Sequence, residues 1–126
     1  MKTITFKDFS VGADIENIKR FRRLNKKTDK IFFKKILTDK ELAYCFISHD
    51  PAPHLAGRFS AKEAIIKALG GLGENGLAFN KMEILNNKIG APEVFFKEKK
   101  FKKYRIKITI SHTKDLALAM AIALKK

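Results

Sequence analysis

Apolar and polar residues alternate along the last part of the chain. Over 106–110 every second residue is isoleucine, with lysine and threonine between, which predicts a strand with one buried face. Over 116–124 bulky apolar residues alternate with four alanines, which predicts a strand with one bulky and one flat face. We expect 111–115 to form the turn between them. The flat alanine face could accept a closely packed helix or another subunit.

The N-terminal half of the chain has helical periodicity instead. Apolar residues recur at helical spacing from Ile15 to Leu24, with basic residues between them, so a helix is predicted there after extended pieces at 3–6 and 10–15. Further helices are predicted at 30–37 and 40–47. Asp29 and Asp39 are helix-start residues for these two segments, and Thr38 with Glu41 forms a capping box for the second.

The longest predicted helix follows Pro51 and Pro53 and covers 54–69. Two glycines at 70 and 71 are a natural signal for its C-terminus. After the glycine-rich stretch, 82–86 and 93–96 are predicted to form a hairpin. Helices that precede an antiparallel sheet indicate the α+β class, and at 126 residues we expect a single domain, 1–126, with helices packed on a small antiparallel sheet.

The chain is strongly basic. Its 27 Lys and Arg exceed its 13 Asp and Glu by 14, and the excess lies mainly in 19–35 and 97–103. Such a field attracts nucleic acid, an anionic membrane, an acidic protein or a multiply phosphorylated cofactor, although a lysine-rich surface can also serve solubility alone. Only five of the basic residues are arginine, the side chain best suited to reading bases. Charge therefore does not select among these partners.

Three observations bear on location. The single cysteine, Cys45, cannot form a disulfide within the chain, which fits a reducing compartment. The first residues lack the continuous apolar stretch of a signal peptide. The longest apolar run, 116–124, is far shorter than the roughly 20 residues of a membrane span. We therefore expect a soluble cytoplasmic protein.

The helix predicted at 54–69 carries charged residues at or near its apolar stripe. The stripe contains Lys62 and has Glu63 at its margin. Charges beside a buried face must be paired, bound to metal or neutralised, because desolvating an ion costs several kcal/mol. The alternative is a surface network in which Arg58, Lys62, Glu63 and Lys67 pair across one helical turn.

Two other positions are candidates on weaker grounds. Asp14 follows a glycine that permits close backbone approach, but capping a helix that begins near Ile15 explains it as well. A carboxylate in a first helical turn explains Glu16 in the same way. Ser111 and His112 suggest a nucleophile and base, yet adjacent strand residues point to opposite faces and no G-x-S-x-G elbow is present. The glycines at 70–73 are not a phosphate-binding P-loop.

Taken together, these segments resemble the short bacterial class of 4′-phosphopantetheinyl transferase, the holo-(acyl-carrier-protein) synthases. The resemblance covers nearly the whole chain in order. It rests on the motifs at 11–15, 36–45, 53–64 with 67–70, 83–85, 90–92 and 110–113.

The resemblance implies an activity. It predicts transfer of 4′-phosphopantetheine from coenzyme A to a serine of apo acyl carrier protein, with Mg²⁺ required and 3′,5′-ADP released, as a step of fatty acid biosynthesis. Asp14 and Glu63 would bind the Mg²⁺, and Glu63 and Lys67 would be catalytic, with Lys67 near the pyrophosphate. Arg58 and Lys62 would hold coenzyme A phosphates.

The resemblance also implies partners. Ser111, His112 and Thr113 would contribute to the cofactor pocket across a subunit boundary, since short members are typically trimers. A basic helix would bind the acidic carrier protein through Lys19, Arg20 and Arg23. We expect no nucleic acid or membrane partner.

The chain departs from the family at two places. The segment 97–104 is short and strongly basic where the family has a longer helix, and Glu16 occupies a position that is a third metal ligand only in longer, monomeric transferases. Two other classes stay open: a basic nucleic-acid-binding module, and a noncatalytic relative that binds coenzyme A or carrier protein only.

Overall fold

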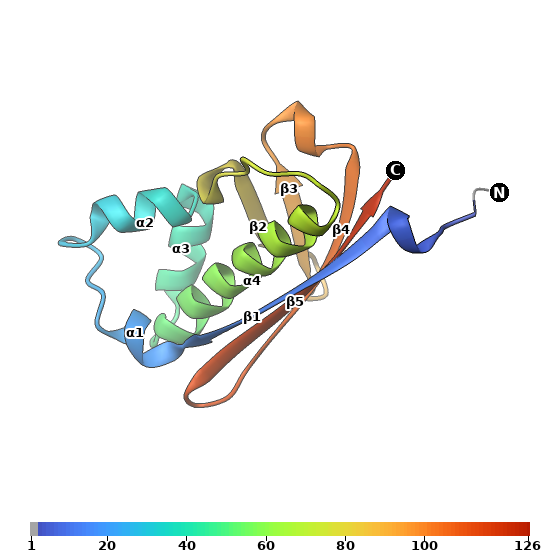
Figure 1. Ribbon diagram of the computed structural model, residues 1–126. Coiled ribbons are helices and arrows are strands. Elements are labelled where there is room, and N and C mark those ends of the chain that lie inside the picture. The colour runs from blue at the N-terminus through green and yellow to red at the C-terminus, as the bar shows by residue number, and fades with distance from the viewer. Residues whose placement is uncertain (1–2) are drawn as a thin grey trace.

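One long helix lies across a three-stranded antiparallel sheet in the computed structural model, which describes residues 3–126 (Figure 1). The helix is α4 (Ala52–Gly71), and the sheet has the strand order β1-β5-β4, so β5 is central. A second sheet is the hairpin of β2 and β3. The predicted α+β arrangement, with helices on a small antiparallel sheet, is confirmed. The strands are β1 (Phe9–Asn17), β2 (Met82–Asn86), β3 (Pro92–Phe96), β4 (Tyr104–His112) and β5 (Leu116–Lys125).

The shorter helices cluster at one end of the molecule, at the left of Figure 1. They are α1 (Ile18–Arg22), α2 (Lys30–Ile36) and α3 (Asp39–Ile47), with single 3₁₀ turns at Phe6–Asp8, Phe79–Lys81 and Lys99–Phe101. The predicted capping box of α3 is present, because the Thr38 hydroxyl accepts from the Glu41 amide and the Glu41 carboxylate accepts from the Thr38 amide. The last of the 3₁₀ turns lies in the basic segment 97–104.

The alanine face of β5 is the face that accepts α4. Ala117, Ala119, Ala121 and Ala123 are fully buried, and α4 contributes its own small residues Ala61, Ala64 and Ala68 to the contact. On the neighbouring strand β1, a methyl group added at Gly12 would lie 2.0 Å from the carbonyl oxygen of Ala64. Small side chains on both surfaces let the backbones approach closely. Of the two partners predicted for the alanine face, a helix or another subunit, the structure shows the helix.

The bulky face of β5 remains open. Leu118, Met120 and Ile122 are 46%, 45% and 42% exposed. The register pairs these residues with Ile15, Ala13 and Val11 of β1, so the open apolar face extends across both strands. Single exposed apolar residues are ordinary, whereas a continuous patch of this kind marks an interaction surface.

The helix predicted from Ile15 to Leu24 is the main error of the sequence reading. β1 continues to Asn17, and the helix begins only at Ile18. Asp14 and Glu16 therefore lie on a strand, and their interpretations as a helix cap and a first-turn carboxylate are wrong. Ile15 fits the helical spacing of Ile18 and Phe21, but it also continues the strand-like alternation of Val11 and Ala13, and the pairing of β1 with Leu116–Leu124 of β5 extends the strand to Asn17. Within residues 3–126 no helix is both long and apolar enough to cross a membrane.

Candidate active site

Asp14 on β1 lies beside the middle of α4, at the turn that carries Glu63. The Ser60 hydroxyl donates to the Asp14 carbonyl oxygen at 2.9 Å. The Lys67 ammonium donates to the Ala13 carbonyl oxygen at 2.9 Å and is 3.5 Å from Asp14 Oδ1. Because Ser60 and Lys67 precede and follow Glu63 on one side of α4, these contacts bring the two predicted acids, which are far apart in sequence, to one place.

Glu16 joins this acidic group because alternate residues of a strand share a face. Burial raises its pKa to about 7, and the neighbouring Asp14 carboxyl group and the negative charge of Glu63 add to the shift. The Arg20 guanidinium, 3.1 Å from Glu16 Oε1, opposes it. The shift is due first to burial, and the contributions of Asp14 and Glu63 indicate that the three carboxyl groups lie near one another.

The acidic group fits a magnesium ion in its chemistry. Asp14 Oδ2 is buried and has no hydrogen-bond partner among the described residues, so this oxygen can still accept a ligand. Mg²⁺ prefers oxygen donors and is commonly held by one or two carboxylates together with substrate phosphates and water. Within residues 3–126 no three acidic, histidine or cysteine side chains are arranged to hold a metal by themselves. Two carboxylates that share the ion with a phosphorylated substrate are consistent with that finding.

A second group lies around Arg58, in a cavity of about 180 Å³. Its lining includes His54 from the start of α4, His112 from the end of β4 and Asn86 from the end of β2. Arg58 is 6% exposed, and its Nε has no hydrogen-bond partner among the described residues. Burial lowers the pKa of His54, and the positive charges of Arg58 and His112 lower it further. The lining residues include the permanent cation Arg58 and no carboxylate, so this cationic cavity is suited to an anionic ligand.

The three predicted pocket residues of the last turn are in different surroundings. His112 lies opposite Ala117, on the inner face of the sheet, whereas Ser111 lies opposite Leu118, on the open face. The two side chains therefore point apart, as the alternation of a strand requires. The Thr113 hydroxyl accepts from the amides of Asp115 and Leu116, which closes the turn. Of the three, His112 alone lines the Arg58 cavity.

Residues 10–121 match the 4′-phosphopantetheinyl transferase superfamily. A holo-(acyl-carrier-protein) synthase of Chlorobaculum parvum is 45% identical over 113 residues, which cover 89% of this chain and 95% of that protein. The chain belongs to the 4′-phosphopantetheinyl transferase superfamily.

Solved structures of holo-(acyl-carrier-protein) synthases share the fold of this transferase. The enzyme of Neisseria meningitidis is 31% identical with a TM-score of 0.73, and the match covers 92% of this chain and 98% of that one. The enzyme of Helicobacter pylori, solved in complex with coenzyme A, is 26% identical with a TM-score of 0.74, covering 92% and 99%. The resemblance stated from the motifs is thereby confirmed, and the chain is a phosphopantetheinyl transferase.

The structure contradicts the predicted phosphate role of Lys62 in this transferase. The side chain is fully buried, and its ammonium donates to the Ile36 carbonyl oxygen at 2.8 Å, Glu41 Oε1 at 2.6 Å and the Phe79 carbonyl oxygen at 2.9 Å. A lysine ammonium has three donors, so none remains for a substrate. Burial lowers the pKa of Lys62, and the Glu41 carboxylate opposes that shift. The network of surface ion pairs proposed for 58–67 is wrong for the same reason.

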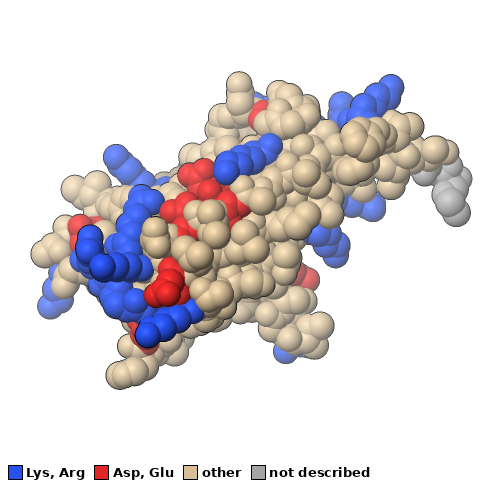
Figure 2. Space-filling model, turned by 60° about the horizontal axis from the view of Figure 1, so that its bottom comes forward, with Lys and Arg blue, Asp and Glu red and all other residues tan. Residues whose placement is uncertain are grey.

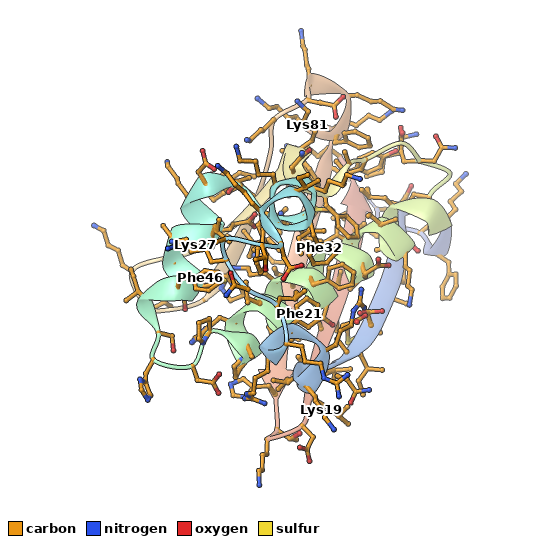
Figure 3. All side chains as sticks on the ribbon, turned by 90° about the vertical axis from the view of Figure 1, so that its left-hand side faces the viewer. Lys19, Phe21, Lys27, Phe32, Phe46 and Lys81 are labelled. Atoms are coloured by element: carbon orange, nitrogen blue, oxygen red, sulfur yellow. The ribbon has the colours of Figure 1, made fainter. Side chains whose placement is uncertain are left out.

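The predicted docking residues lie on the end of the transferase that carries the short helices. Figure 2 shows a dense group of Lys and Arg side chains at this end, with acidic side chains beside it. Lys19 and Arg23 are exposed, whereas the Arg20 guanidinium is held by Glu16 and lies over the rings of Phe21 and Phe59 at 5.4 and 5.2 Å. Figure 3 shows Lys19 at one edge of this end, with Phe21, Phe32 and Phe46 further in.

Sequence reasoning missed two residues of the transferase's cationic cavity. Tyr44 comes from α3 and Asn86 from β2, and both contact Arg58. Tyr44 lies inside the motif at 36–45 and Asn86 directly follows the motif at 83–85, but neither motif indicates a contact with Arg58, which is 28 positions from Asn86. The sequence signal was that charged side chains on the helix at 54–69 require partners, which does not identify those partners.

Proposed function

We propose that this chain transfers the 4′-phosphopantetheine group of coenzyme A to a serine of acyl carrier protein, releasing 3′,5′-ADP, as a step of fatty acid biosynthesis in the cytoplasm. The observation that carries the proposal is the pairing of Asp14 with the Glu63 turn of α4, with Lys67 donating to the same stretch of β1. This arrangement offers carboxylate oxygens for a divalent cation and a cation for a diphosphate.

Asp14 and Glu63 would hold Mg²⁺, which neutralises and polarises a pyrophosphate when it is bound. The serine hydroxyl oxygen forms a bond to the β-phosphorus of coenzyme A, and the bond from that phosphorus to the bridging oxygen breaks. The electron pair leaves with 3′,5′-ADP. Glu63 would take the hydroxyl proton, and the Lys67 ammonium would offset charge that develops on the phosphate oxygens.

The cationic cavity would bind phosphate of coenzyme A through Arg58 and His112. This assignment is supported by the unpartnered Arg58 Nε and by the relative from Helicobacter pylori, whose structure contains coenzyme A. On α4, Arg58 and Glu63 are five residues apart, which turns their side chains about 140° away from each other. A ligand that contacts both groups would therefore bind more readily between two subunits, with one group supplied by each, than within a single subunit.

A homotrimer would satisfy this requirement. The open face of β1 and β5 is apolar and continuous, as a subunit interface would be, and Ser111 lies on the same face. In such an assembly Ser111 and Thr113 of one subunit would contribute to the coenzyme A pocket of the next, as the family resemblance implies.

Carrier protein would dock on Lys19 and Arg23, with Arg20 serving the acidic group as well. Replacing Arg23 with Glu should raise the KM for carrier protein about tenfold, because an attractive charge becomes a repulsive one at a steered encounter. The KM for coenzyme A should stay within twofold. Lys99→Glu, which makes the same change of charge at an exposed position of the 3₁₀ turn Lys99–Phe101, is the matched control. Equal losses for both substrates would count against a docking role.

The decisive experiment mixes the protein with apo carrier protein, coenzyme A and Mg²⁺ and weighs the carrier. A mass gain of one phosphopantetheine group is expected, and Glu63→Gln should lower the rate at least about 100-fold. In calorimetry the same variant should lose Mg²⁺ binding while its unfolding temperature is unchanged. Glu98→Gln, an exposed carboxylate elsewhere, should behave as wild type. Near-normal turnover by Glu63→Gln would refute its assignment.

The same mixture separates the two other classes. A noncatalytic relative would bind coenzyme A and leave the carrier mass unchanged. A nucleic-acid-binding module would bind RNA in a salt-dependent manner without binding coenzyme A.

A further inference from the structure

The guanidinium of Arg58 is held from two sides by residues of other elements. Its Cζ lies 4.7 Å from the ring centroid of Tyr44 on α3. Its Nη2 donates to Asn86 Oδ1 at 3.3 Å, and the Asn86 amide donates in turn to the Tyr44 hydroxyl at 3.0 Å. Arg58, Tyr44 and Asn86 thus form a closed triangle of contacts that connects α4, α3 and β2.

This triangle leaves the cavity side of the guanidinium available. Arginine carries five N–H donors, of which one meets Asn86 and one, at Nε, has no partner among the described residues. Arg58 is only 6% exposed, so an unsatisfied N–H on it costs about 1–3 kcal/mol unless a ligand accepts from it. The cavity beside it is also lined by His54 and His112, and no carboxylate is among its lining residues. Arg58 thus retains unused donors while it lines a cavity suited to an anion.

We propose that Tyr44 and Asn86 are positioning residues for Arg58. The Tyr44 ring fixes the plane of the guanidinium, and the Asn86 amide fixes its rotation in that plane. Arg58 then presents its free N–H groups toward a phosphate of coenzyme A, without the loss of side-chain freedom that a mobile arginine would suffer on binding. This proposal rests on the proposed function, which supplies the ligand, and it adds two residues whose part in binding acts through Arg58.

A purely structural role for the triangle predicts a different outcome. If Tyr44 only packs α3 against α4, its replacement lowers stability, and coenzyme A binding falls no more than for any equally destabilised variant. Tyr44 is 37% exposed and on the rim of the cavity, so its ring can be changed without opening the core.

The test measures the Kd for coenzyme A by calorimetry at a temperature where every variant is folded. Tyr44→Leu should raise the Kd about five- to tenfold, because it removes both the ring face and the hydroxyl. Tyr44→Phe keeps the ring and should raise it about twofold. Ile47→Ala, which changes an exposed side chain on the same helix, is the control and should leave the Kd unchanged.

A double-mutant cycle distinguishes a positioning role from a packing role, because a loss of packing alone would not make the effect of Tyr44→Leu depend on Arg58. In an Arg58→Ala background, Tyr44→Leu should weaken coenzyme A binding no further, because its effect passes through the missing guanidinium. In turnover assays Tyr44→Leu should raise the KM for coenzyme A by the same factor and leave kcat and the KM for carrier protein unchanged. Additive losses in the cycle would overturn the positioning role.

Different results would overturn the proposed function and the positioning role of Tyr44 and Asn86. Wild-type protein that binds no coenzyme A overturns the proposed function and this proposal with it. Wild-type binding that Tyr44→Leu leaves unchanged overturns the positioning role alone.

Discussion

Burying a lysine ammonium is costly, and Lys62 meets that cost with three acceptors. Its partner Glu41 accepts from the Thr38 amide and the Ile84 amide as well, so one ion pair connects α2, α3, α4 and β2. At the scale of single residues, adjacent residues on α4 thus have different roles. Lys62 serves the fold, whereas Glu63 at the next position is half-buried and its charge acts on Glu16 of the acidic group. A helix turns about 100° per residue, which is enough to separate the two roles.

Replacing Lys62 with Met should destabilise the protein by about 3–5 kcal/mol, because it leaves the Glu41 carboxylate buried without its counter-charge. The double variant Lys62→Met with Glu41→Gln should recover part of that loss, since the amide keeps an acceptor and removes the charge. Urea unfolding measures both. A single variant within 1 kcal/mol of wild type would contradict the role given to this pair.

At the scale of elements, the close contact between β1 and α4 determines where Asp14 lies. Gly12 is two residues before Asp14, and its Cα approaches the α4 backbone at Ala64 and Ala68. The same contact places Ser60 and Lys67 against β1. Packing and site geometry are therefore one feature here, because any wider spacing of strand and helix separates Asp14 from Glu63.

Gly12→Ala should lower both stability and activity. Its new methyl group would lie 2.0 Å from a backbone oxygen that cannot rotate away, so strand and helix must move apart at a cost of about 1–3 kcal/mol. Gly70→Ala is the matched control: nothing lies within 4 Å of the added carbon, and alanine in a helix favours stability by up to about 1 kcal/mol. Thermal unfolding and Mg²⁺ binding are the measurements. Equal behaviour of the two variants would contradict this account.

At the scale of the whole molecule, the two candidate binding groups lie on different sides of α4. The acidic group lies toward the β1 edge of the sheet, and the cationic cavity toward the β4 edge. The remaining large apolar feature is the open face of β1 and β5. An assembly through that face would cover the apolar surface and join the two groups between subunits.

Met120→Asp should convert the proposed trimer to monomer and abolish transfer, because a buried unpaired carboxylate at an apolar interface is strongly unfavourable. Analytical ultracentrifugation measures the mass, and circular dichroism should show an unchanged subunit fold. Ile47→Asp, an apolar residue 84% exposed on α3, is the control and should leave the assembly intact. A wild-type protein that sediments as a monomer with full activity would rule out the shared site.

Much of the fold follows from local pattern. The alternation over 106–110 and 116–124, the capping box of α3 and the glycines after α4 depend on neighbours within a few positions, and each element is present close to its predicted bounds. The error at 15–17 arose because Ile15 continues both the helical spacing of the residues after it and the alternation of the residues before it, and distant pairing with β5 decides between them.

The motifs determined the family and the candidate acids, since the order of residue types along the chain is enough for a resemblance. Tertiary structure alone decided that Lys62 is buried against Glu41, that Tyr44 and Asn86 contact Arg58, and that the alanine face of β5 accepts α4. The physical reason is the same in each case. The pairing of a buried charge and the packing of a flat face depend on residues that are distant in the chain, and only folding brings these residues together.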